Sequence, residues 1–302
     1  MKTFFTDIPN SNKWKILQKI TEGWSHDEKY HIQTEGSTQF LLRISDGISL
    51  EKEKAHYKAL TELNSKNVRV SKLIEEGVCN GGKNTFRLFS WIEGVEVNKA
   101  LNSFSEKEQY DFGVEAGTIL KEIHQINAPV NHTDWATHYN KKINTKIEQY
   151  QNCGLNLEHA DKILAYIEEH RNLLKERPIC FHHGDFHIGN MLITPKKELA
   201  VIDFNRLDFG DPWEEFNRTN WSASESPWFA SGQINGYFEN DVPVDFFELM
   251  ALYMGVNQLG AIPWAIPYGE KQIEILLAQT KEVLEWYENF NQVIPKWYID
   301  FF

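Results

Sequence analysis

Three side chains in the middle of the chain have the types and the spacing that phosphoryl transfer needs. Asp185 and Asn190 stand five positions apart in the run HHGDFHIGN, and Asp203 follows an apolar, strand-like run thirteen positions after Asn190. One Asp can direct the attacking hydroxyl, while the Asn and the second Asp can hold magnesium against nucleotide phosphates. A single Asp after Gly is more often a turn residue. The prediction of a phosphotransferase therefore depends on the three residues together.

The order and spacing of these residues match the catalytic-loop and metal-binding pattern of kinases. Asp185 follows a short apolar strand, so we expect it on a loop that a substrate hydroxyl can reach. Asn190 and Asp203 offer the oxygen ligands that Mg2+ prefers. His183 and His187 raise zinc as an alternative, but no third nitrogen or sulfur ligand has a suitable spacing. Packing roles are therefore favoured for both histidines.

The elements before residue 92 predict a small sheet with one helix. Residues 14–22, 29–34 and 39–44 are predicted extended runs. In the second and third runs apolar residues alternate with polar or smaller ones, which is the pattern of half-buried strands. A helix is predicted from residue 49 to about residue 64. Two more strands, residues 68–78 and 85–91, are joined by a turn rich in Gly and Asn.

A change of pattern after Gly94 predicts a second, mainly helical lobe. Ser105 and Glu108 form a capping box that opens an amphipathic helix ending at His124. We therefore predict an α+β fold with two lobes, an antiparallel-sheet lobe over residues 1–92 and a helical lobe over residues 93–302. The apolar region 246–266 is interrupted by polar residues, so it predicts a buried core helix rather than a membrane span.

Composition limits the class of protein and its partners. The 302 residues are 41% hydrophobic and 25% charged, which is typical of globular proteins, and the net charge is −12. That charge argues against nucleic acid or an anionic membrane as partner and is compatible with a cationic substrate. The three scattered cysteines, Cys79, Cys153 and Cys180, predict reduced thiols in a cytoplasmic protein.

Two features of the first lobe suggest phosphate contacts. The turn around Gly23 and Ser25 could cover phosphates with backbone amides and a hydroxyl, although most such turns bind nothing. Arg43 ends an apolar run where a kinase places its phosphate-binding lysine, and Glu53 in the following helix could pair with it. An ordinary ion pair on a small sheet is the alternative.

Nearly the whole chain resembles the aminoglycoside phosphotransferase family, which has the protein-kinase fold and includes kinases for choline and related alcohols. The resemblance rests on motifs along the whole chain. They are Gly23-Trp24-Ser25, Lys29-Tyr30, Phe40 to Ile44, Leu88 to Gly94, His183 to Asn190, Ile202-Asp203-Phe204 and Gly210 to Trp213.

The resemblance implies roles for individual residues. Asp185 is then the catalytic base, Asn190 and Asp203 bind magnesium, and the backbone of the hinge holds the purine of ATP or GTP. The hinge consists of Ser90, Trp91 and Ile92. Two positions depart from the family pattern. Arg43 replaces the usual Lys, which changes the geometry of phosphate contacts, and Glu215 replaces an Asp that makes a structural contact at a helix start.

The acceptor pocket is expected in the helical lobe. Carboxylates crowd the segment after Asp203 and tryptophans follow, a combination that suits a polyamine sugar. The carboxylates are Asp208, Asp211, Glu214 and Glu215, and the tryptophans are Trp213, Trp221 and Trp228. Helix caps and solvated surfaces are the alternative for each of them. By resemblance to some aminoglycoside 3′-phosphotransferases, Phe302 could contact the substrate through its carboxylate.

The sequence therefore predicts a magnesium-dependent kinase that uses ATP or GTP and phosphorylates a small cationic molecule, most simply an aminoglycoside antibiotic. A second interpretation keeps the chemistry and changes the acceptor to an amino alcohol, an amino acid or a sugar. A third is an inactive kinase-like binding protein, which only Arg43 favours.

Overall fold

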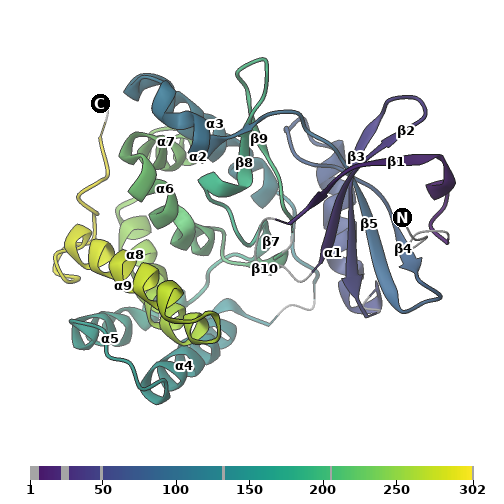
Figure 1. Ribbon diagram of the computed structural model, residues 1–302. Coiled ribbons are helices and arrows are strands. Elements are labelled where there is room, and N and C mark those ends of the chain that lie inside the picture. The colour runs from purple at the N-terminus through teal and green to yellow at the C-terminus, as the bar shows by residue number, and fades with distance from the viewer. Residues whose placement is uncertain (1–6, 22–26, 48–49, 131–132, 205, 301–302) are drawn as a thin grey trace. The chain divides into compact units, whose positions relative to one another are not determined.

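The chain folds into two compact units (Figure 1). In this computed structural model the described residues are 7–21, 27–47, 50–130, 133–204 and 206–300, and the side chains of residues 50–54 are not described. The first unit contains residues 1–96 and 190–207, and the second contains residues 97–189 and 208–302. Residues 190–207, which the predicted ranges assign to the second lobe, thus group with the first.

A five-stranded antiparallel sheet forms most of the first unit. Its order is β1-β2-β3-β5-β4. The strands are β1 (Trp14–Ile20), β2 (Glu28–Thr34), β3 (Gln39–Asp46), β4 (Leu73–Cys79) and β5 (Asn84–Ser90), and α1 (Leu50–Ser65) connects β3 to β4. The predicted alternation is confirmed, because Tyr30, Ile32, Leu42 and Ile44 are buried together on one face.

The predicted strand over residues 68–78 is wrong in its first part. β4 begins only at Leu73, and Val70 instead forms an isolated parallel bridge with Val201. The backbone N–H of Val201 donates to the Arg69 carbonyl at 2.9 Å, and that of Ser71 donates to the Val201 carbonyl at 3.1 Å. These bonds attach a small sheet of order β6-β8-β9 to the first unit, which explains why residues 190–207 belong there. Its strands are β6 (Val95–Glu96), β8 (Met191–Ile193) and β9 (Leu199–Val201).

The second unit is mainly helical. Its helices of eight or more residues are α3 (Glu106–His124), α4 (Trp135–Asn152), α5 (Ala160–His170), α7 (Pro227–Phe238), α8 (Val244–Ala265) and α9 (Glu270–Trp286), and the shorter ones include α2 (Val97–Ala100) and α6 (Thr219–Glu225). β7 (Cys180–His182) pairs with β10 (Asp208–Gly210). The capping box at Ser105 and Glu108 is confirmed.

α8 with its following turn is long and apolar enough to cross a membrane, but 72% of its most apolar window is buried. Among these residues Met250, Ala251, Leu252 and Met254 are fully buried. The predicted core helix is therefore confirmed.

α3 and α7 approach so closely that their backbones touch, and they lie beside each other in Figure 1. Each helix has two glycines four residues apart, Gly113 and Gly117 on α3 and Gly232 and Gly236 on α7. A Cβ on any of the four would overlap backbone atoms of the other helix, for example the Phe229 carbonyl oxygen for Gly113. Only glycine permits this packing.

Candidate functional site

The nucleotide-side candidates lie in the first unit, where the structure brings Arg43 and Asp203 into contact. Arg43 Nη1 donates to Asp203 Oδ1 at 2.5 Å, across 160 positions of sequence. Asp203 has a φ of +70°, a left-handed conformation that is uncommon for residues other than Gly. Such backbone outliers persist where the surrounding structure enforces them and cluster at functional sites. The Asp203 side chain is 31% exposed, so a ligand can reach it.

Asn190 and Asp203 lie at the same end of the β8–β9 hairpin. Met191 pairs with Val201, and the backbone N–H of Ile202 donates to the Asn190 carbonyl at 3.0 Å. The two predicted metal ligands therefore flank adjacent strands. Their amide and carboxylate oxygens are the donor types that suit a hard cation, and Asp203 already holds the cationic group of Arg43.

Arg43 is a buried cation between two carboxylates. Its side chain is only 3% exposed. On the side away from Asp203, its Nε and Nη2 donate to Asp27 Oδ2 at 3.2 and 2.7 Å. Asp27 was missed from sequence, since it stands just before β2 with no motif to mark it. Glu53, the predicted partner, lies in α1 with its side chain outside the described set, and Ser25 lies outside the described residues.

Two backbone N–H groups of the predicted hinge form hydrogen bonds within the first unit. The backbone N–H of Ser90 donates to the Lys72 carbonyl at 2.8 Å, and that of Trp91 donates to the Gln39 carbonyl at 3.3 Å. Within the described residues, no hydrogen bond is found for Ile92 N–H or for the Trp91 carbonyl. Trp91 also stacks on His31 at a ring-centroid distance of 3.6 Å.

The catalytic-loop candidates lie in the second unit. Asp185 follows β7 in a loop, and its side chain is 21% exposed. Arg218 Nε is 3.3 Å from Asp185 Oδ1, and His187 Nε2 is 3.8 Å from Oδ2. His183 Nδ1 accepts the Asp185 N–H at 3.3 Å, and His187 Nδ1 accepts the Gly189 N–H at 3.1 Å. Both histidines thus stabilise loop turns.

Glu215 holds this loop from the interior. Its carboxylate is 1% exposed and accepts the backbone N–H of His183 at 2.8 Å and of Gly184 at 2.7 Å. His124 Nε2 lies 3.2 Å from it. Burial raises the pKa of Glu215, but the His124 hydrogen bond and the neighbouring imidazoles outweigh it and lower the pKa to about 2. No surface of Glu215 remains for an acceptor, so a structural role replaces its predicted substrate contact.

The other predicted acceptor residues differ in access. Glu214 contacts Lys142 Nζ at 2.8 Å and is 13% exposed, whereas Asp208 is exposed and caps the N–H of Phe209. Asp211 is fully buried, where it accepts two bonds from Arg177 and one from Tyr253. Phe302 lies outside the described residues.

One described group has the side-chain types and proximity of a metal site. His124, Cys180 and His182 have ligand atoms within 4.8 Å of one another. However, both ring nitrogens of His124 already contact other side chains, Tyr237 at 2.9 Å and Glu215 at 3.2 Å. Burial also raises the pKa of the Cys180 thiol and disfavours the thiolate that metals bind. We therefore assign this cluster to the support of the loop that carries Asp185.

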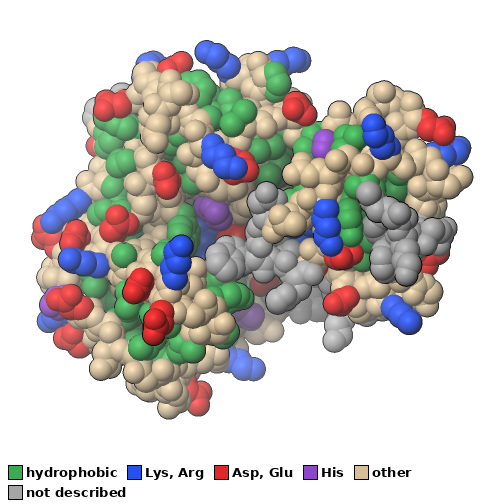
Figure 2. All heavy atoms as spheres, viewed as in Figure 1, with side chains coloured by type: hydrophobic (Ala, Val, Ile, Leu, Met, Phe, Trp, Pro, Cys, Tyr) green, Lys and Arg blue, Asp and Glu red, His purple; other side chains and the backbone are tan. Residues whose placement is uncertain are grey.

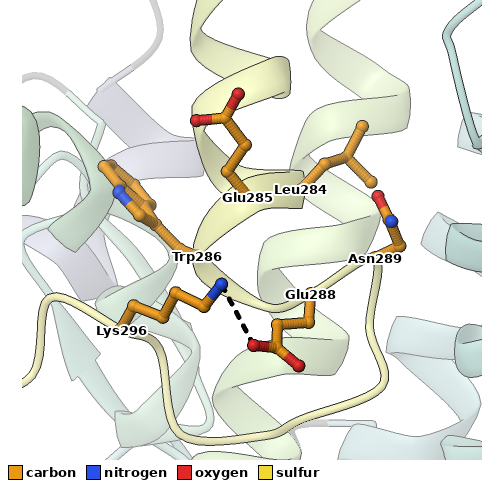
Figure 3. A pocket seen from close by; sticks show the side chains of 6 residues that line it. All are labelled: Leu284, Glu285, Trp286, Glu288, Asn289 and Lys296. Atoms are coloured by element: carbon orange, nitrogen blue, oxygen red, sulfur yellow. Dashed lines mark ion pairs between the residues drawn. The ribbon is translucent and has the colours of Figure 1, made fainter.

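A separate hollow of about 520 Å³ lies near the end of α9 (Figure 3). Lys296 and Glu288 are among the residues that line it, and they form an ion pair at 3.0 Å. It contains none of the predicted site residues. On the face shown in Figure 2, acidic and basic side chains are interspersed.

Comparison with known proteins identifies the family. The sequence profile of the phosphotransferase enzyme family, APH, matches residues 16–247. No curated protein matches the chain in sequence at a significant level.

Solved structures share the fold over nearly the whole chain. The gentamicin complex of APH(2")-IIa has 18% identity and a TM-score of 0.60, covering 91% of each chain. A thermostable mutant of aminoglycoside phosphotransferase APH(4)-Ia with ADP and hygromycin B has 15% identity and a TM-score of 0.65, covering 90% of this chain and 94% of that one. The GDP complex of a mutant aminoglycoside 2'-phosphotransferase-IIIa has 13% identity and a TM-score of 0.66, covering 95% and 96%.

At these identities the likeness concerns the fold, and it confirms the predicted kinase-like α+β architecture. The profile match covers most of the chain and includes Arg43, Asp185, Asn190 and Asp203. The chain therefore belongs to the phosphotransferase enzyme family, as its motifs predicted.

Proposed function

We propose that the protein transfers the terminal phosphate of ATP or GTP to a hydroxyl group of a small cationic molecule, with an aminoglycoside as the first candidate acceptor. Membership of the phosphotransferase enzyme family supports the reaction class. The structures with ADP, GDP, gentamicin and hygromycin B are of other proteins with this fold, and they guide the choice of donor and acceptor to test.

The observation that carries the proposal is a partly exposed carboxylate on a loop that is held by a buried one. Glu215 holds the backbone of His183 and Gly184, and Asp185 follows directly with its carboxylate partly open to solvent. Asp185 would accept or orient the proton of the attacking hydroxyl. Arg218 beside it fixes the direction of the carboxylate. A base that is held in place by its surroundings adds rate through positioning.

The first unit, in this proposal, binds the nucleotide. Arg43 would contact the phosphates, and Ile92 N–H with the Trp91 carbonyl would contact the purine. Asn190 and Asp203 would hold magnesium, which when bound supplies charge neutralisation for the phosphates. Ser25, Glu53 and Ser90 remain candidates for this side. Residues 1–92 would make up most of the nucleotide lobe and residues 93–302 most of the acceptor lobe.

The acceptor side of the proposal depends on charge. Asp208 is exposed and Glu214 is partly so, which suits the ammonium groups of a polyamine sugar. Both are offered as acceptor contacts, together with Phe302.

Nucleotide turnover against a panel of hydroxyl acceptors tests the proposal. We expect phosphorylation of at least one aminoglycoside and a loss of roughly a hundredfold or more in Asp185→Asn, with nucleotide binding retained. Turnover with amino alcohols or sugars and none with aminoglycosides would change the acceptor class. Unchanged turnover in Asp185→Asn would show that Asp185 is not the base, and absence of nucleotide binding by the wild type would overturn the proposal.

A further inference from the structure

Arg43 bridges two carboxylates that differ in access. Asp27 receives two donors from Arg43 and its side chain is 21% exposed, whereas Asp203 receives one and is 31% exposed. The guanidinium itself is 3% exposed. Two edges of one planar fork are therefore used by two different acid groups, an arrangement that a lysine ammonium could not reproduce with the same geometry.

The strand register explains why this cation needs a permanent counter-charge. Lys29 on β2 and Arg87 on β5 are the cross-strand neighbours of Arg43 on β3. Directly paired residues lie on the same face of a sheet, so three cationic residues form a row. Asp27 stands two positions before Lys29, which places it beside the same face. A buried guanidinium that loses its partners is strongly destabilised.

Arg43 and a metal ion at Asp203 would each weaken the binding of the other, because two cations that share one carboxylate repel. Arg43 Nη1 occupies Asp203 Oδ1 at 2.5 Å, and under the proposed function Asp203 is also a magnesium ligand. Two cations would then compete for one carboxylate. Asp27 has no such second role in the proposed site, so it can retain Arg43 when Asp203 turns to the metal.

We propose that Asp27 is a positioning residue that holds Arg43 in place for the nucleotide phosphates and weakens its hold on Asp203, so that magnesium can take that carboxylate. This inference rests on the proposed function, because it assigns Arg43 to the phosphates and Asp203 to the metal. It also gives a physical reason for arginine at a position where related kinases use lysine: the arginine must reach both acids.

The test compares Asp27→Asn with Glu28→Gln. Glu28 is the neighbouring carboxylate, 47% exposed, and pairs with Lys19 at 2.9 Å away from Arg43. For each variant, binding of a fluorescent ATP analogue is titrated with Mg2+, and KM for ATP and kcat are measured. In Asp27→Asn, Arg43 has fewer acids to share and holds Asp203 more tightly. We expect the Mg2+ midpoint and KM to rise about tenfold, with kcat changed less than threefold.

Glu28→Gln should leave the Mg2+ midpoint within twofold of the wild type. A thermal melt of each variant shows that it is folded at the assay temperature. A purely structural role for Asp27 would lower the melting temperature without moving the Mg2+ midpoint of the folded protein. Equal midpoints in Asp27→Asn and Glu28→Gln would overturn the inference.

Arg43→Lys gives a second route that does not depend on the folding of the Asp27 variant. An ammonium that stays with Asp27 releases Asp203, so the Mg2+ midpoint should fall below that of the wild type. A midpoint that is unchanged or higher would show that Asp203 is the dominant partner and would overturn the inference. Failure of the proposed function can be told apart from failure of this inference alone. In the first case the wild type itself would bind no nucleotide, and that result would overturn both the proposed function and the role of Asp27.

Discussion

The two units hold their candidate site residues by different physical means. In the first unit, Arg43 is held by side-chain ion pairs to Asp27 and Asp203, both of which a solvent-borne ligand can approach. In the second, Glu215 is buried and binds backbone N–H groups of His183 and Gly184. Ion pairs between side chains can exchange partners when a ligand arrives. A carboxylate bonded to the backbone fixes the course of a loop and has no other state available.

The exposed fractions show the same contrast. The Asp203 carboxylate is 31% exposed, whereas that of Glu215 is 1% exposed. Electrostatic contacts strengthen as water is excluded and weaken where it enters. We therefore expect the Glu215 contacts to dominate stability and the Arg43 contacts to dominate ligand binding.

The largest test of this contrast is Glu215→Ala. It leaves two backbone N–H groups without acceptors beneath the Asp185 loop, which should lower the free energy of unfolding by about 4 kcal/mol. Urea unfolding measures the change. Glu214→Gln is the matched control on the adjacent residue, where loss of the Lys142 pair should cost about 1 kcal/mol or less. Equal losses in the two variants would contradict the contrast.

The contribution of the Glu215 carboxylate to the free energy of unfolding should depend on pH. The pKa of Glu215 in the folded protein is about 2, against a reference value of 4.5. The unfolded chain therefore binds a proton at higher pH than the folded chain does. The contribution of Glu215 is complete above about pH 4.5 and is lost as the pH falls toward 2, by about 3 kcal/mol in total. Urea unfolding between pH 6 and pH 2.5 should show a flatter pH dependence in Glu215→Gln. If the free energy of unfolding depends on pH equally in Glu215→Gln and in the wild type, another group causes that dependence.

A smaller effect is expected from a neutral hydrogen bond on the same loop. Ser222 Oγ accepts the backbone N–H of Ile188 at 3.2 Å. Ser222→Ala leaves that buried N–H without its acceptor and should cost about 1.5 kcal/mol, measured by urea unfolding. Ser224→Ala, two residues along the same helix and with its hydroxyl at the surface, should cost less than half as much.

Asp203→Asn should change stability less than Ser222→Ala does, although its effect on function should be the most complete. Arg43 keeps Asp27, so the free energy of unfolding should fall by less than about 1 kcal/mol. Mg2+-dependent binding of a fluorescent ATP analogue should be lost under the proposed function. A loss of stability larger than that of Ser222→Ala would show that the Arg43 contacts are structural rather than exchangeable.

Local patterns in the sequence were enough to select several residues of the candidate site. Spacing marked Asp185, Asn190 and Asp203 as candidates, and alternation predicted β2 and β3, the second of which carries Arg43. The contact between Arg43 and Asp203 spans 160 positions, and no local pattern records it. Glu215 was noted as a departure at a helix start, but its bonds to His183 and Gly184 appear only when the loop and the helix are packed together. Because the Glu215 side chain is buried, it binds the loop and cannot contact a substrate.

Asp27 and Ser222 illustrate a second reason for missed residues. Both are common residue types with no motif, and each acts on one group brought to it by tertiary structure, Arg43 for Asp27 and Ile188 N–H for Ser222. Strand register could have drawn attention to Asp27, because it precedes the cross-strand neighbour of Arg43 by two positions. No comparable signal existed for Ser222.

The glycine contact between α3 and α7 has a consequence for the order in which parts of the protein unfold. The two backbones meet at Gly113, Gly117, Gly232 and Gly236 with no side chain between them, so neither helix can loosen without parting from the other. Their amide protons should therefore exchange with solvent together and late, as one cooperative block. Any partly opened state that retains structure in the second unit should retain this pair of helices.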